Sequence, residues 1–428
     1  MIRASRLLLG KLGGNLFDQA LSAISNVVLA IVVARSLDAA GFGSFSIAFL
    51  IYGIAFAALK SIVGQPLQIL HSGSSPSELR ERTGEGLGAT VAISILAGLA
   101  CAATGLGMGG TTGEALFALG LWLPALLIQD CCRMAFFAAD RPWSAAVIDG
   151  VWALVQFPLL VAFIASGNTS LGWLMGAWGA GAALSGALGL AMLRVWPRVG
   201  RAWSWLVEKA GLSRYLLAEY VLGLGAAQLG ILLVGVIVGE AGVGSLRAAQ
   251  VLLGPLGILG TAAFQFAVPE VARSRGASAR RLRGFGAGVS AGLLIAHLAY
   301  ISLLLLIPDP IGFELFGDSW AGADSVLLAM SLAACFSCLA NGPAGVLYGL
   351  GWARTTFRIN LVKGPMLLIA VPVVTWLWGV IGAAWALMVI EALILPFWAV
   401  SLVRATRIGQ PPTWESNSRV PIESTLEA

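Results

Sequence analysis

Twelve apolar segments, each about long enough to cross a bilayer, follow one another along this chain of 428 residues. A helix that spans the hydrocarbon layer needs roughly 20 apolar residues, and only helices or closed barrels satisfy the backbone there. The pattern therefore predicts an all-α membrane protein with twelve transmembrane helices. The expected spans are residues 12–34, 43–66, 86–107, 115–137, 145–165, 171–193, 215–238, 246–268, 285–307, 324–346, 359–378 and 380–403.

Composition agrees with this prediction. The chain is 58% hydrophobic and only 11% charged, which is more apolar surface than one soluble core could bury. The first span follows Arg3, Arg6 and Lys11 as a signal sequence would. It is longer than a cleaved signal core, however, so we expect it to remain as the first helix.

The distribution of positive charge predicts an orientation. All 26 Lys and Arg residues except Arg35, Lys60 and Arg247 lie in or beside alternate connections, together with the two ends. Such a bias marks the cytoplasmic side of a membrane protein. We therefore expect both termini in the cytoplasm, in the inner membrane of a bacterium.

An internal repeat divides the chain. Residues 40–45 (AGFGSF) recur as residues 241–246 (AGVGSL), and the same offset of 201 places Asp18 on Glu219. Six helices per repeat give both halves the same orientation, which implies a symmetry axis along the membrane normal.

The repeat predicts four parts of the chain. Residues 1–193 and 215–403 would each form a six-helix lobe. Residues 194–214 mix Trp with Arg and Lys, as an amphipathic helix at the cytoplasmic interface does. Residues 404–428 form a polar tail, expected to be disordered.

Ionisable side chains within the spans are candidate functional groups, because each costs free energy in hydrocarbon. A carboxyl such as Glu391, near the middle of the last span, is either protonated or paired. A lone histidine such as His297 is also compatible with simple packing and a local hydrogen bond. The candidates for binding a coupling proton or cation are Asp18, Asp149, Glu219, His297 and Glu391.

Lys60 is the most informative cation. It lies about 9 Å from the cytoplasmic end of its span at 1.5 Å per residue, so it either snorkels to the interface or faces a cavity and awaits an anion. Arg133 follows Asp130 by three residues, which leaves an intrahelical ion pair open. Such cations around a cytoplasmic mouth would suit phosphate groups. The candidate substrate-binding residues are Lys60, Arg133, Arg247, Gln250 and Lys363.

Several other classes of site are not indicated. The chain has no Gly-x-x-x-x-Gly-Lys-Ser/Thr loop for nucleotide hydrolysis. Cys335 and Cys338 have metal-ligand spacing but no second ligand pair, so we interpret them as small apolar residues. We expect no cofactor, no metal and no nucleic-acid partner.

Several short motifs resemble one known family. They are residues 34–38 (ARSLD) with 41–43 (GFG), 60–66 (KSIVGQP), 129–133 (QDCCR), 140–142 (DRP), 244–250 (GSLRAAQ) with 254–256 (GPL), and 317–320 (GDSW). The chain is similar in these to the Wzx-type flippases of lipid-linked oligosaccharides, within the multidrug/oligosaccharidyl-lipid/polysaccharide (MOP) exporter superfamily. The resemblance covers most of the chain, and its motifs are diffuse rather than catalytic.

The resemblance implies two lobes around a central cavity that opens alternately to each side, the MATE-like fold. It also implies an undecaprenyl-diphosphate-linked oligosaccharide as the substrate, held by Lys60 and by Arg133, Arg247 and Lys363. Membrane lipids, a proton or sodium gradient, a polysaccharide polymerase and glycosyltransferases are the implied partners. The lipid II exporters of the superfamily usually have two further helices and more cavity arginines, which disfavours that branch.

Two alternatives remain open at this point. A multidrug or metabolite antiporter of the same superfamily would need an acidic lobe site, for which Asp18 is the candidate. A membrane-embedded enzyme of glycan assembly would usually carry catalytic groups on a large external loop. The external loops here are short, and the external acid Asp38 is weak support for an enzyme.

The charge bias makes a topological prediction. A cysteine placed in the tail after residue 404 should react with impermeant thiol reagents only after the cells are opened, because the tail is expected in the cytoplasm. A cysteine in the loop around residue 310 should react in intact cells and serves as the positive control. Labelling of the tail from outside in intact cells would contradict the twelve-helix topology.

Overall fold

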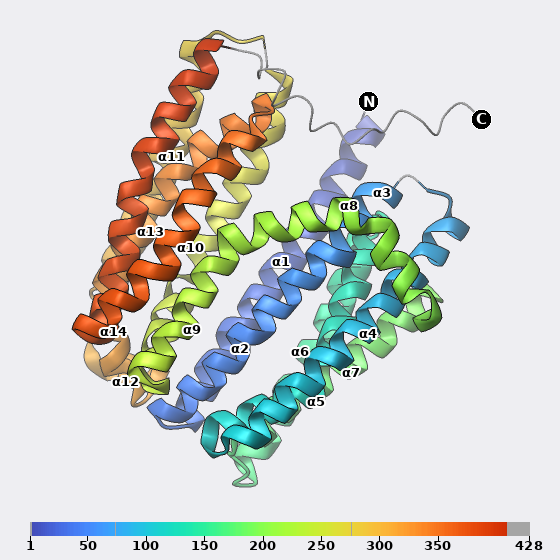
Figure 1. The fold of residues 1–428 in the computed structure, drawn as a ribbon, viewed down its shortest axis with the longest axis vertical. Coiled ribbons are helices and arrows are strands. Elements are labelled where there is room, and N and C mark those ends of the chain that lie inside the picture. The colour runs from blue at the N-terminus through green and yellow to red at the C-terminus, as the bar shows by residue number, and fades with distance from the viewer. Residues whose placement is uncertain (1, 73, 275, 409–428) are drawn as a thin grey trace. The chain divides into compact units, whose positions relative to one another are not determined.

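The structure is a computed structural model that describes residues 2–72, 74–274 and 276–408. Figure 1 shows that long helices make up almost all of this part of the chain. The longer helices are α1 (Ile2–Ser36), α2 (Ala39–Leu59), α4 (Pro76–Met108), α5 (Gly110–Ala138), α6 (Pro142–Ala165), α7 (Leu171–Leu193), α8 (Ala202–Tyr220), α9 (Ala226–Val238), α10 (Glu240–Arg273), α11 (Ala279–Leu304), α13 (Ser319–Leu350) and α14 (Ala353–Ile408). The shorter elements are η1 (Lys60–Gly64), α3 (Gln65–His71), η2 (Val199–Arg201), η3 (Val221–Gly225) and α12 (Asp309–Phe316).

The prediction of an all-α membrane protein is confirmed. Among the described residues, nine helices are long and apolar enough to cross a membrane, or ten if the bent pair α8–α9 counts as one span. The first expected span lies within α1. Two further expected spans, residues 359–378 and 380–403, both lie within α14.

α14 contains a break that separates these two spans. Trp378 and Gly379 have non-helical backbone angles, and Gly379 has φ of 64°. Glycine adopts this left-handed conformation without the steric cost that a Cβ atom brings. The 56 residues of α14 therefore form two helical arms joined at a glycine.

The chain divides into two compact units, and each is described by itself. Unit 1 comprises Met1–Val251 and Asp309–Ala323. Unit 2 comprises Leu252–Pro308 and the described residues from Asp324 onward. α9 and the first part of α10 thus belong to unit 1, although the repeat assigns them to the second half of the chain. The two six-helix repeats therefore remain a prediction from the sequence.

The linker and the tail have simple local structure where they are described. Within the linker, α8 buries Trp205 completely but leaves Trp203 76% exposed. The amphipathic cytoplasmic linker over residues 194–214 stays a prediction. Arg404 to Ile408 form the last turn of α14. Residues 409–428, the rest of the predicted tail, lie outside the described residues.

The two copies of the repeated Ala-Gly-x-Gly-Ser motif pack against each other in unit 1. A Cβ atom on Gly43 would lie 1.9 Å from the carbonyl oxygen of Glu240, and one on Gly244 would lie 3.2 Å from the carbonyl of Ala39. Small residues let helices approach this closely. Thr112 reinforces the contact, because its hydroxyl donates to the Glu240 carboxylate at 2.8 Å and lies 3.0 Å from the hydroxyl of Ser44.

Gly43 therefore offers a test of this contact. Gly43→Ala should lower the free energy of unfolding by about 1–3 kcal/mol, because the added methyl group forces α2 and α10 apart. Thermal unfolding in detergent would measure the loss. The control is Gly176→Ala on α7, where nothing lies within 4 Å of the new Cβ and the helix should be unchanged or slightly stabilised. Equal unfolding midpoints for the two variants would contradict the packing.

Candidate functional site

A cavity of about 320 Å³ lies within unit 1, lined by side chains from α1, α2, η1, α5, α6 and α7. Its size falls in the range of small-molecule sites, which is roughly 300–1,000 Å³. α6 contributes Asp149, Trp152 and Gln156, at spacings of three, four and seven residues, so that they share one helical face. Both charged groups and aromatic rings line its wall.

Arg133 of α5 is the centre of the charged part. Its Nε and Nη2 atoms donate to one carboxylate oxygen of Asp18 at 3.0 and 2.6 Å. Nη1 lies 3.6 Å from Asp130, and Nε lies 3.4 Å from Asp149. All four side chains are buried. The guanidinium therefore joins α1, α5 and α6 through three carboxylates.

This cluster changes the interpretation of two predicted residues. Asp18 and Arg133 were expected to serve different ligands, a coupling ion and a phosphate, yet they contact each other directly. The possible ion pair between Asp130 and Arg133 is present as well. Because three carboxylates surround the guanidinium, an incoming anion would have to displace at least one of them.

Lys60 lines the same cavity, but unlike Arg133 it forms no ion pair with a described residue. It is the first residue of the π-helical turn η1 and one of the cavity-lining residues. Its ammonium lies 6.0 Å from the centre of the Phe56 ring. Within the described part of the chain, no carboxylate lies within ion-pair distance of Lys60. It is thus a half-buried cation with an aromatic neighbour and room for an anion.

Aromatic rings form another part of the wall. Tyr52 meets Trp178 edge to face at 4.9 Å, and Phe49 stacks on the same ring at 5.6 Å. The Trp152 ring lies 6.4 Å from that of Trp178, and its indole nitrogen donates to the Trp178 carbonyl at 3.0 Å. These contacts hold the rings in fixed orientations beside the cavity.

Two glutamines complete the lining. Gln129 donates to Asp149 at 2.8 Å. Gln156 is only 3% exposed, and its Nε2 atom has no hydrogen-bond partner among the described residues. A buried amide without a partner is costly, so this donor is available to a ligand. Sequence reasoning missed Gln129, Gln156, Trp152 and Trp178, although the face that Gln156 shares with Asp149 could have revealed it.

Arg247 and Gln250 lie on α10. The Arg247 guanidinium is centred 4.2 Å from the ring centre of Phe49, a cavity-lining residue. Its Nε atom is buried and has no hydrogen-bond partner among the residues described. Gln250 is half-buried. Neither residue lines the cavity, so they stay predicted substrate-binding residues whose role the geometry leaves open.

The remaining predicted residues lie elsewhere. In unit 2, Lys363 donates to Glu391 at 2.5 Å, which joins the two arms of α14. His297 is buried, and its Nδ1 atom lies 2.8 Å from the carbonyl of Leu293, as the packing interpretation expects. Glu219 is exposed near the end of α8, unlike its repeat counterpart Asp18.

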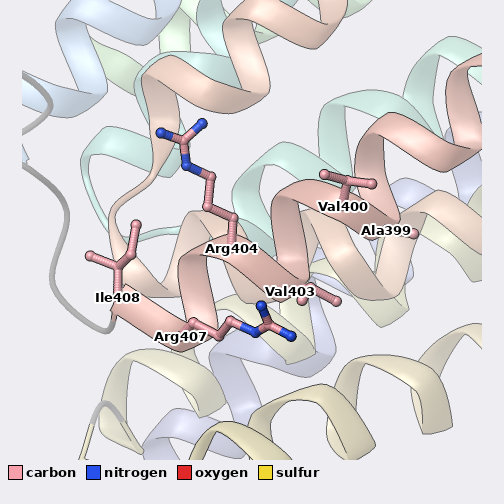
Figure 2. A pocket seen from close by; sticks show the side chains of 6 residues that line it. All are labelled: Ala399, Val400, Val403, Arg404, Arg407 and Ile408. Carbon is pink, nitrogen blue, oxygen red and sulfur yellow. The ribbon is translucent and has the colours of Figure 1, made fainter.

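A second cavity, of about 440 Å³, lies at the end of α14. Figure 2 shows that Arg404 and Arg407 extend from this helix in different directions, and the apolar residues Val400 and Val403 line the same cavity. Cations at a helix C-terminus are expected from the helix dipole alone. The polar side chains of this cavity therefore do not converge on one position where a ligand could bind.

Metal binding finds no support in the described residues. No group of three or more His, Cys, Asp or Glu side chains there could hold a metal ion. Cys335 and Cys338 are buried free thiols, and the Cys338 sulfur donates to the carbonyl of Cys335 at 3.1 Å. This local contact agrees with their interpretation as small apolar residues.

Comparison with known proteins places the fold. No protein-family model matches the sequence, and no curated protein matches it. A multidrug-resistance MATE transporter of the MOP superfamily, in an inward-facing conformation, is similar in structure with a TM-score of 0.67 and 14% identity, over 90% of this chain and 96% of the other. The lipid II flippase MurJ, in an inward closed conformation, has a TM-score of 0.67 at 13% identity, over 93% and 88%.

A MOP-superfamily transporter from Pyrococcus furiosus, whose binding pocket is described as having reversed polarity, has a TM-score of 0.57 at 10% identity, over 92% and 94% of the two chains. The chain therefore has the fold of MOP-superfamily transporters, as the predicted MATE-like architecture requires. At these identities the similarity defines the fold alone.

The charged cluster makes a prediction for Asp18. Asp18→Asn should weaken transport driven by an imposed proton or sodium gradient, because it removes the carboxylate that contacts Arg133 most closely. Assembly should survive, since Asp130 and Asp149 still neutralise the guanidinium and no buried charge is left unpaired. The measurement is transport in proteoliposomes over a series of gradients. Glu314→Gln, an exposed acid on α12, is the control, and wild-type gradient dependence in Asp18→Asn would reject the role.

Proposed function

We propose that this protein is a flippase that moves an undecaprenyl-diphosphate-linked oligosaccharide from the cytoplasmic to the external leaflet for the synthesis of a cell-surface polysaccharide. The observation that carries the proposal is Lys60, a cation that lines a cavity at membrane depth without a carboxylate partner among the described residues. A cation held within an apolar helix without an anion is costly, even when it is only half-buried. A diphosphate is an anion that could relieve this cost as the lipid enters.

The two cations at the cavity, Arg133 and Lys60, have different surroundings and therefore different proposed roles. The guanidinium of Arg133 is held by Asp18, Asp130 and Asp149, so its role is to organise the cluster. The ammonium of Lys60 is a compact point charge on a flexible stem and suits phosphate oxygens that arrive from more than one direction. The phosphate role therefore falls first on Lys60.

The neutral part of the cavity suits the sugar that follows the diphosphate. Sugar rings present apolar C–H faces and hydroxyl groups, and the wall offers the rings of Tyr52, Trp152 and Trp178 together with the unpartnered amide of Gln156. Aromatic faces supply contact area, and an amide donor supplies orientation. Charged, aromatic and amide groups in one cavity match a ligand that has both a charged part and a sugar part.

The setting follows from the charge pattern. We place the protein in the bacterial inner membrane with both termini in the cytoplasm, so that Lys60 lies toward the cytoplasmic side, where lipid-linked units are made. A proton or sodium gradient would drive the cycle through Asp18 and its neighbours. A polysaccharide polymerase and glycosyltransferases would act after and before the flipping step.

The substitution Lys60→Ala tests this proposal most directly. It should raise the substrate concentration for half-maximal flipping by about tenfold or more, since a charge-assisted hydrogen bond contributes roughly 1.5–3 kcal/mol. Lys60→Arg should be the mildest change because it keeps the charge. Flipping would be measured in proteoliposomes at matched protein levels, with an undecaprenyl-diphosphate-linked oligosaccharide that carries a fluorophore on the glycan.

The control for lost charge alone is Arg80→Ala, at an exposed position of α4, which should flip like wild type. If Lys60 merely snorkels, Lys60→Ala also behaves like wild type, or its loss follows expression level. Equal rates for Lys60→Ala and wild type at subsaturating substrate would remove Lys60 from the site.

A second candidate function has its own supporting observation. Asp18, Asp130 and Asp149 outnumber the cations Arg133 and Lys60 around the cavity, and aromatic rings lie beside them. Carboxylates with aromatic faces also suit organic cations, as a multidrug or metabolite antiporter would require. The fold is shared with transporters and a flippase, which disfavours the enzyme alternative.

Glycan analysis of a deletion strain separates the two candidates. A flippase predicts lipid-linked oligosaccharide trapped on the inner leaflet. An antiporter predicts unchanged surface glycan with altered tolerance to cationic drugs.

A further inference from the structure

The turn that carries Lys60 has an unusual backbone. η1 (Lys60–Gly64) is a π-helical turn between α2 and α3, in which the backbone N–H of Gln65 donates to the carbonyl of Lys60. Pro66 follows Ile62 by four residues and has no N–H to donate. The carbonyl of Ile62 therefore lacks its usual α-helical partner, at the place where the helix departs from α geometry.

The linker helix α8 supplies donors to that carbonyl. The indole nitrogen of Trp205 lies 3.4 Å from the carbonyl oxygen of Ile62, and the hydroxyl of Ser213 lies 3.2 Å from it. Both distances are longer than the usual ranges of about 2.7–3.2 Å for N–H···O and 2.5–3.0 Å for O–H···O, so each bond is weak alone, but both converge on one acceptor. Trp205, Lys209 and Ser213 are spaced four residues apart, so they share the face of α8 that is buried against η1.

Packing and charge fix α8 in this place. Gly86 of α4 leaves room for the contact, because a Cβ there would lie 2.9 Å from a methyl group of Val63 and 3.6 Å from the Trp205 ring. The ammonium of Lys209 lies 5.6 Å from the centre of the Trp205 ring and 2.7 Å from Glu208. Arg82 of α4 in turn lies 3.3 Å from Glu208.

We propose that Trp205 and Ser213 are positioning residues for Lys60: they hold the carbonyl of Ile62 in the π turn, and the turn directs the ammonium into the cavity. In an α-helix each residue advances by about 100°. A π turn that relaxed to α geometry would therefore change the direction of Lys60 relative to α3 by a comparable angle. The inference rests on the proposed function, since it assumes that Lys60 meets the substrate phosphate.

The test combines Trp205→Phe with Ser213→Ala, which removes both donors and keeps the ring. Loss of the hydrogen bonds should raise the substrate concentration for half-maximal flipping by about three- to tenfold, while the maximal rate stays at the wild-type value. The matched control is Trp203→Phe with Ser204→Ala, the same changes at exposed positions of α8, which should flip like wild type.

A double-mutant cycle separates positioning from a general structural role. Adding Trp205→Phe and Ser213→Ala to Lys60→Ala should cause no further loss, because the positioning residues act through a side chain that is no longer present. Losses that multiply in the combined variant, or that follow protein yield, would overturn the proposal.

A readout without transport keeps this test separate from the proposed function. The chain has only four lysines, Lys11, Lys60, Lys209 and Lys363, so acylation by acetic anhydride can be followed at each by mass spectrometry. Removing the two donors should change the acylation rate of Lys60 severalfold and leave that of Lys363 unchanged. An unchanged Lys60 rate overturns the positioning role. A changed rate supports it, even if Lys60→Ala flips like wild type and the proposed function fails.

Discussion

The guanidinium of Arg133, held among three carboxylates, is the interaction on which the candidate site depends. It contacts Asp18, Asp130 and Asp149 and so ties α1 and α6 to α5 within unit 1. In a medium that supplies few hydrogen bonds, removal of one partner from a buried ion pair costs about 3–5 kcal/mol when the remaining charge is left alone. With three carboxylates around it, the guanidinium keeps a carboxylate partner when any one of them is removed.

The cost of leaving a charge unpaired in hydrocarbon also explains the ion pair of unit 2. Lys363 and Glu391 pair across the two arms of α14, which meet at the break beside Gly379. Arg283 of α11 donates to the hydroxyl of Thr406 at 2.7 Å, near the end of α14. Lys363 thus has its partner on the other arm of the helix, because hydrocarbon leaves a charge no alternative to an internal partner. Lys60, like the buried Nε atom of Arg247, has no such partner among the described residues, and a residue that departs from a structural rule is a candidate for function.

The orientation of Lys60 is linked to Pro66, which follows the turn that carries Lys60. Pro66 deprives the Ile62 carbonyl of its helical donor, the turn becomes a π-helix, and α8 supplies donors from a segment more than 140 residues away. π-helical turns within α-helices are frequent at functional sites. The linker between the two repeats is thus connected to the cation that we assign to the substrate phosphate, without a direct contact between them.

Much of the architecture could be read from the sequence, since each span follows from length and apolarity and the glycine motif at residues 40–44 marks the repeat. The candidate residues Asp18, Arg133, Lys363 and Glu391 could be found as well, because any charge within an apolar span stands out. The partners of these residues could not be found from the sequence. Helical periodicity tells which face a residue occupies but not which helix that face meets, so the pairing of Arg133 with Asp18, 115 residues apart, was decided by packing. Gln156 and the two tryptophans became site residues for the same reason: a neutral side chain in an apolar helix gains its role only from the cavity beside it.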